Sequence, residues 1–185
     1  TEAAMTGTSA GRLGSRLRIV IWGAAALMLL APLLAMQVTD EVRWDAADFA
    51  IFGGMLVTAG GAYELAARVT GDRVYRTAVG LALAGAFTLA WANLAVGVIG
   101  PEDHPANLMY FGVLAVGVIG AAVARLQPQG MVRALVATAL AQALAALIAM
   151  IAGLGSSYMV TGFFVVLWLG SAWLFQRAAR TRGAR

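Results

Sequence analysis

Side chains able to bind a cation or move a proton are scarce in this chain, and most of them lie in two short polar stretches. The first, TDEVRWDAADF, runs from 39 to 49 and holds four carboxylates, one arginine and one tryptophan. The second, PEDHPAN, runs from 101 to 107 and contains the only histidine. Carboxylate oxygens are the usual ligands of hard cations such as Ca²⁺. The residues of this candidate acidic cluster are Glu41, Asp45, Asp48, Glu102, Asp103 and His104.

The same residues also fit a structural role. Neither stretch has the ligand spacing of an EF-hand. If 41–48 is helical, Glu41, Asp45 and Asp48 share one face with Trp44, and the segment would lie along an apolar–water boundary. Asp48 also precedes an apolar run and would accept N–H groups as its helix cap. We therefore expect an external polar turn and a helix cap, and we assign no metal ligand.

No other pattern predicts catalysis. The absence of cysteine excludes thiolate chemistry, disulfides and iron–sulfur clusters. A hydrolase set can be assembled from Ser156, Ser157, His104 and Asp103, but the sequence has no nucleophile elbow around either serine. We assign no catalytic residue and no cofactor, and an enzyme is the third choice behind two non-catalytic classes.

The composition predicts what surrounds most of the chain. Of 185 residues, 61% are hydrophobic and only 12% are charged. A soluble domain uses about 25% charged residues, so much of this surface must face lipid. A helix needs about 20 mostly apolar residues to cross the hydrocarbon core. Six runs qualify, at 19–36, 49–67, 77–100, 108–124, 134–154 and 158–175.

These runs predict an all-α fold, a polytopic transmembrane bundle of six helices within a single domain, 1–185. They lack the alternation of barrel strands, and a spanning segment that is not part of a barrel must be helical to pair its backbone groups. The connecting loops are short, so neighbouring spans are expected to pack as antiparallel pairs.

The distribution of arginine predicts the orientation of the chain in the membrane. All thirteen basic residues are arginines, and Arg43 alone would lie on the side opposite the other twelve. Because positively charged loops stay inside, both termini are expected to be cytoplasmic. Tryptophan and tyrosine should mark the two membrane surfaces. On this basis Trp22, Trp168 and Trp173 belong to the cytoplasmic side, and Trp44 and Tyr158 to the outer side.

Three polar residues fall inside predicted spans. Glu64 is the only carboxylate there, and an intramembrane acid is a functional candidate because an unpaired charge in lipid is costly. Arg68 follows at i+4, in the favourable order for a helical ion pair, so a structural pairing is the alternative. Asn93 and Gln142 are amides that would bond a neighbouring helix or line a polar cavity.

Small residues predict close helix packing. Glycines cluster in the second and fourth runs, and the fifth is rich in alanine on more than one face. Without a hydrophobic drive between helices in lipid, such residues let backbones approach and gain dispersion contacts. The fifth helix is therefore expected to touch protein on several sides.

The stretch from Val38 to Gly112 resembles a family of small, uncharacterised, proteobacterial six-span integral membrane proteins. The segments that carry the likeness are VTDEVRWDAADFAIFGG, GAYELAARVTGDRVYRTAVGLALA and WANLAVGVIGPEDHPANLMYFG. The resemblance implies a bacterial inner (plasma) membrane and no particular activity.

Two functional classes follow. The first is an accessory or assembly subunit that packs its small-residue faces against other membrane proteins, or against copies of itself. The second is a small transporter or channel for a cation or small solute that uses Glu64, with Asn93 and Gln142 along the path. The arginines flank apolar runs, so lipid rather than nucleic acid is the expected partner.

Overall fold

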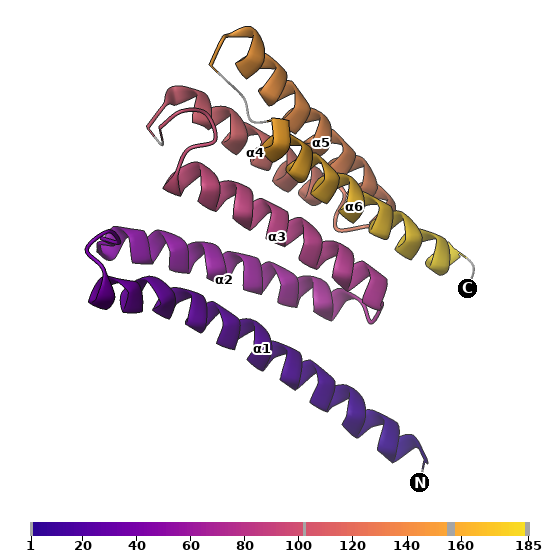
Figure 1. Ribbon diagram of the computed structural model, residues 1–185. Coiled ribbons are helices and arrows are strands. Elements are labelled where there is room, and N and C mark those ends of the chain that lie inside the picture. Colours follow the sequence, from indigo (N-terminus) through magenta and orange to yellow (C-terminus); the bar gives the residue numbers. More distant parts are fainter. Residues whose placement is uncertain (1, 102, 155–157, 184–185) are drawn as a thin grey trace. The chain divides into compact units, whose positions relative to one another are not determined.

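The computed structural model describes residues 2–101, 103–154 and 158–183 (Figure 1). Within them the chain forms six α-helices and one short 3₁₀ helix, η1, at Pro105–Asn107, which confirms the all-α prediction. The α-helices are α1 (Glu2–Val38), α2 (Ala46–Val69), α3 (Arg73–Ala95), α4 (Leu108–Val123), α5 (Pro128–Ile151) and α6 (Tyr158–Gly183).

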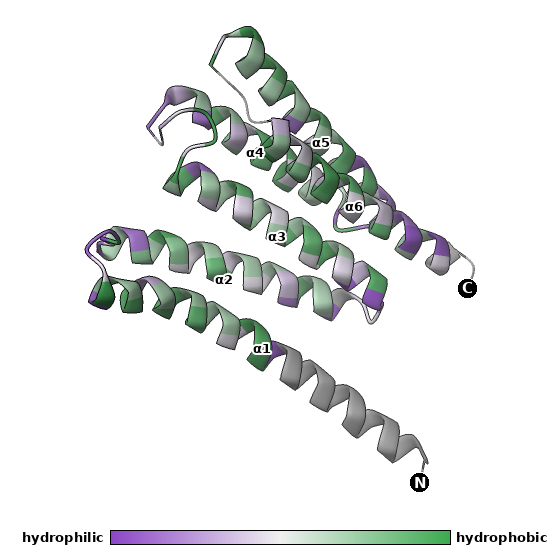
Figure 2. Ribbon diagram, viewed as in Figure 1, coloured by the Kyte–Doolittle hydropathy of each residue, from purple (hydrophilic) through white to green (hydrophobic). Residues whose placement is uncertain are grey.

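The structure contains six helical segments long and apolar enough to cross a membrane, the fourth formed by η1 and α4 together, as expected of a multi-pass integral membrane protein. These segments are Arg18–Val38, Ala46–Arg68, Arg73–Ala95, Pro105–Val123, Pro128–Ile151 and Tyr158–Thr181. Figure 2 shows hydrophobic residues along the helices and hydrophilic residues gathered near helix ends and loops.

The third helix ends earlier than the apolar run suggests. The run extends to Gly100, whereas α3 stops at Ala95. Gly97 and Gly100 have φ values of 78° and 63°, a conformation that ends a helix and favours glycine. A Cβ on Gly97 would also lie 2.7 Å from the carbonyl oxygen of Gly100, so the turn has no room for a side chain.

The structure divides into two compact units, Thr1–Glu64 and Leu65–Arg185, and each is described by itself. The first unit pairs α1 with most of α2. A Cβ on Gly60 would lie 3.5 Å from the indole of Trp22, and one on Gly53 would lie 3.8 Å from Leu29. These two glycines, seven residues apart, place one face of α2 against α1.

The second unit is a ring of four helices. Neighbours around the ring are α3 and α4, α4 and α5, α5 and α6, and α6 and α3 (Figure 1). Gly120 lies so close to α5 that an added Cβ would be 2.7 Å from Cβ of Ala134. Of the six candidate spans, that of α5 has the largest buried share, as its alanines predict.

Two turns at the end of the ring opposite η1 are held by side chains. Arg76 donates to the carbonyl oxygens of Ala67 and Thr70, which neutralises the C-terminal end of α2. Asp72 caps α3 by accepting from the N–H of Val74. At the α4–α5 turn, the Tyr75 hydroxyl donates to the carbonyl oxygen of Leu126 over 2.6 Å. Arg76 thus has a structural role besides any effect on orientation.

Candidate functional site

The stretch TDEVRWDAADF leads into α2 and supplies its N-terminal cap. Asp45 accepts hydrogen bonds from the N–H groups of Ala47 (2.7 Å) and Asp48 (3.0 Å), and Asp48 accepts one from the N–H of Asp45 (2.9 Å). This reciprocal arrangement is a capping box. The ring of Trp44 packs edge-on against Phe49 at 5.2 Å, the contact of a hydrophobic staple across the cap.

Two expectations for this stretch are corrected by the structure. Residues 41–45 are not helical, so the acids do not form an amphipathic segment. The N-cap is Asp45 rather than Asp48, because α2 begins at Ala46, three residues before the apolar run. The sequence signal was present in the pattern W-D-x-x-D-F, which places a cap residue, its reciprocal acid and the staple pair at the required spacing.

Two other members of the acidic cluster, Glu41 and His104, take part in local turns. The backbone N–H of Glu41, and not its carboxylate, forms the hydrogen bond to the Thr39 hydroxyl in this turn. His104 caps η1, since its Nδ1 accepts from the N–H of Ala106 over 3.2 Å. Asp103 is exposed, and Glu102 lies outside the described residues. Among the residues the structure covers, no three His, Asp or Glu side chains gather as a metal site.

Asn93 and Asn107 fasten the 96–107 loop to the ring. Asn93 donates from Nδ2 to the carbonyl oxygen of Asn107 over 2.9 Å. The Asn107 amide accepts from the N–H groups of Val98 and Ile99 and donates to the carbonyl oxygen of Pro101. Both asparagines are buried, and Oδ1 of Asn93 has no hydrogen-bond partner. Asn93 therefore positions a loop.

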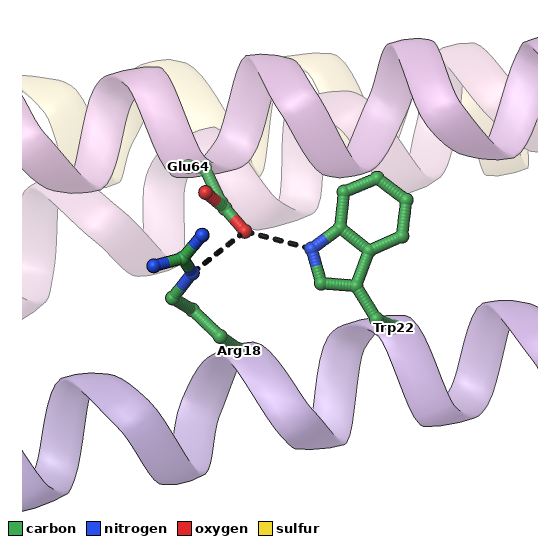
Figure 3. A network of polar contacts seen from close by, with 3 residues as sticks. All are labelled: Arg18, Trp22 and Glu64. Atoms are coloured by element: carbon green, nitrogen blue, oxygen red, sulfur yellow. Dashed lines mark hydrogen bonds and ion pairs between the residues drawn. The ribbon is translucent and has the colours of Figure 1, made fainter.

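Glu64 joins α2 to α1 (Figure 3). One carboxylate oxygen, Oε1, accepts from Nε1 of Trp22 over 2.7 Å and from Nε of Arg18 over 3.2 Å. The Glu64 side chain is 13% exposed and that of Arg18 is 61% exposed. Glu64 lies four residues before the end of its candidate span and Arg18 begins the other candidate span, so the network lies near one end of both spans. The pairing of Glu64 with Arg68 stays a prediction.

Gln142 differs from the other buried polar side chains of the ring because neither polar atom of its amide is hydrogen-bonded. Its side chain is completely buried on α5, and both its amide oxygen and its amide nitrogen lack a partner. An unsatisfied buried polar group costs about 1–3 kcal/mol, and lipid offers no water to compensate. The expected bond to a neighbouring helix is absent, and Gln142 makes none to Asn93.

Trp168 is a buried residue whose burial the sequence did not reveal. Assigned to the aromatic belt, it is instead 2% exposed inside the ring, and its indole Nε1 has no hydrogen-bond partner. That belt assignment is wrong. Trp173, five residues on, is 50% exposed and carries the Arg177 guanidinium 3.8 Å above its ring, as a surface tryptophan would.

No protein-family model matches the chain, and neither curated proteins nor solved structures contain a significant match to it. Function therefore has to be argued from the contacts themselves.

Proposed function

We propose that the protein is a non-catalytic accessory or assembly subunit of a larger complex in a bacterial inner membrane, with both termini in the cytoplasm. The observation that supports this is a ridge of small residues on α2. Ala50, Gly54, Thr58 and Ala62 repeat at four-residue spacing, and all are exposed. The hydroxyl of Thr58 donates to the carbonyl oxygen of Gly54, so the ridge presents no unsatisfied donor.

The ridge is suited to helix association rather than to lipid. Small-xxx-small ridges let a second helix approach closely, which is a major source of affinity between helices in membranes. A Cβ added to Gly54 would meet no atom of the first unit within 4 Å, so this position is open within that unit. The α1-facing positions Gly53 and Gly60 lie on a different side of the same helix. A helix of another subunit therefore fits the ridge.

A matched pair of variants tests the proposal. Gly54→Leu fills the ridge, whereas Gly112→Leu makes the same change at an equally open glycine on α4. We expect the wild type and Gly112→Leu to co-migrate stoichiometrically with a larger assembly after mild detergent extraction, and Gly54→Leu to migrate alone. A lone wild-type protein, or equal behaviour of the two variants, would refute the docking role of α2.

Transport of a small solute or cation is the second candidate, and the polar interior of the ring favours it. The buried polar side chains of the described chain are Asn93, Asn107, Thr138, Gln142 and Ser171. All five belong to α3, η1, α5 or α6. Glu64 contributes less to this candidate than its sequence position suggests, because Trp22 and Arg18 already bond its carboxylate. If Glu64→Gln abolishes transport in vesicles, Glu64 belongs to the transport path after all.

A further inference from the structure

Gln142 lies on the buried face of α5 in the four-helix ring. The buried positions of α5 form one continuous face, and Gln142 lies in the middle of it. On one side of that face, Thr138 and Ala134 meet Gly117 and Gly120 of α4. The nearest buried neighbours of Gln142 along α5 are Thr138, Ala139, Ala145 and Ala146. Three of these four neighbours are alanines, so the long polar side chain of Gln142 stands among mostly short side chains on its own helix.

Trp168 lies at the same level on the adjacent helix. Gln142 is nine residues before the end of α5 and Trp168 is ten residues after the start of α6, or about 14 and 15 Å along each helix. The two helices are antiparallel neighbours joined at these ends, so both side chains sit at a similar depth. The six-membered ring of Trp168 faces α3, where a Cβ on Gly85 would lie 3.1 Å away.

Together the two side chains offer an unusual set of groups. Gln142 supplies two amide hydrogens and an acceptor oxygen, and Trp168 supplies one N–H donor. None of these atoms has a partner, although each is buried. Buried polar groups in proteins are almost always satisfied by protein atoms or by ordered water. A molecule that both accepts and donates hydrogen bonds would satisfy them.

The molecule must also be neutral and small. None of the buried residues of the described chain is charged, so an ion at this depth would have no compensating partner. The ring is closely packed elsewhere, with Gly120 and Ala134 in near contact. We propose that the centre of the α3–α6 ring binds a small neutral hydrogen-bonding molecule, water or a solute of similar chemistry, between Gln142 and Trp168.

The indole N–H of Trp168 gives a direct readout. The full chain is labelled with ¹⁵N at the indole nitrogens, placed in lipid nanodiscs and studied by NMR, and Trp168→Phe identifies the resonance. With water bound, the Trp168 N–H shows a cross-peak to a long-lived water that is lost in Gln142→Met. With a solute bound, the resonance shifts as urea, formamide or glycerol is added to the wild type and stays fixed in Gln142→Met.

Thermal unfolding separates an occupied site from a dry one. Methionine is close to glutamine in shape and has no strong hydrogen-bonding group, so Gln142→Met should stabilise a dry core and destabilise an occupied one. We expect its Tm to fall by at least about 3 °C. Ser171→Ala is the control for a buried polar group that is already satisfied, since its hydroxyl bonds the carbonyl oxygen of Ala78. A Trp168 N–H that senses neither water nor solute, together with a raised Tm in Gln142→Met, overturns the proposal.

Discussion

Replacing Trp22 by phenylalanine should destabilise the α1–α2 pair more than replacing Arg18 by glutamine, although only arginine carries a charge. The indole N–H lies 2.7 Å from Oε1 of Glu64, whereas Nε of Arg18 lies 3.2 Å from the same atom. Phenylalanine keeps most of the ring and removes the donor. Glutamine at 18 removes the charge and keeps much of the stem.

The expected magnitudes follow from distance and exposure. A hydrogen bond to a charged group contributes about 1.5–3 kcal/mol. Because Trp22 is 38% exposed, we expect the lower end, about 1.5 kcal/mol, for Trp22→Phe. The Arg18 side chain is 61% exposed, and exposed ion pairs contribute about 0–1 kcal/mol. Water competes for the guanidinium far more than for the indole.

A double-mutant cycle measures the bond itself. Trp22→Phe, Glu64→Gln and the combined variant are unfolded in mixed micelles of rising SDS content and followed by far-UV circular dichroism. The coupling energy between 22 and 64 should exceed that between 18 and 64. The ranking is refuted if Arg18→Gln is the more destabilising variant, or if coupling between 22 and 64 is below about 0.5 kcal/mol.

Three other variants test the packing, the loop and the orientation. Gly120→Ala should destabilise the ring by about 1–3 kcal/mol through contact with Ala134, whereas Gly112→Ala should not, as measured by thermal unfolding. Asn107→Ala leaves the N–H groups of Val98 and Ile99 unpaired, so a cysteine placed at 98 should react with maleimide several-fold faster than in the parent chain. Asp45→Asn with Asp48→Asn should leave orientation unchanged because arginine dominates that rule, and cysteine labelling of the tail from outside would contradict this.

The helices were predictable because their signal is continuous. Each span has about twenty apolar residues in succession, so six helices could be found from composition alone. The ends were harder to place. The third run continues apolar to Gly100, and the helix stops at Ala95 because of backbone conformation at Gly97 and because Asn107 captures the N–H groups of the following loop.

The candidate site was less predictable because bonding across helices depends on geometry. Arg18 and Trp22 bond Glu64 from another helix. Sequence separation of 46 and 42 residues gives no indication of such contacts. In the same way, nothing in the sequence around Trp168 distinguishes an indole inside the ring from one at the membrane surface.

We give more weight to unsatisfied hydrogen-bonding groups than to charge in choosing where a ligand would bind. Glu64 was a candidate because an unpaired carboxylate in lipid costs free energy. The same cost favours structural pairing of such a carboxylate with side chains of a neighbouring helix. Gln142 has no charge, and both polar atoms of its amide remain unpaired at full burial. If a buried amide makes no useful interaction, replacing it with an apolar residue of similar shape stabilises the protein. Gln142 at the centre of an alanine face is therefore best explained by something that binds it.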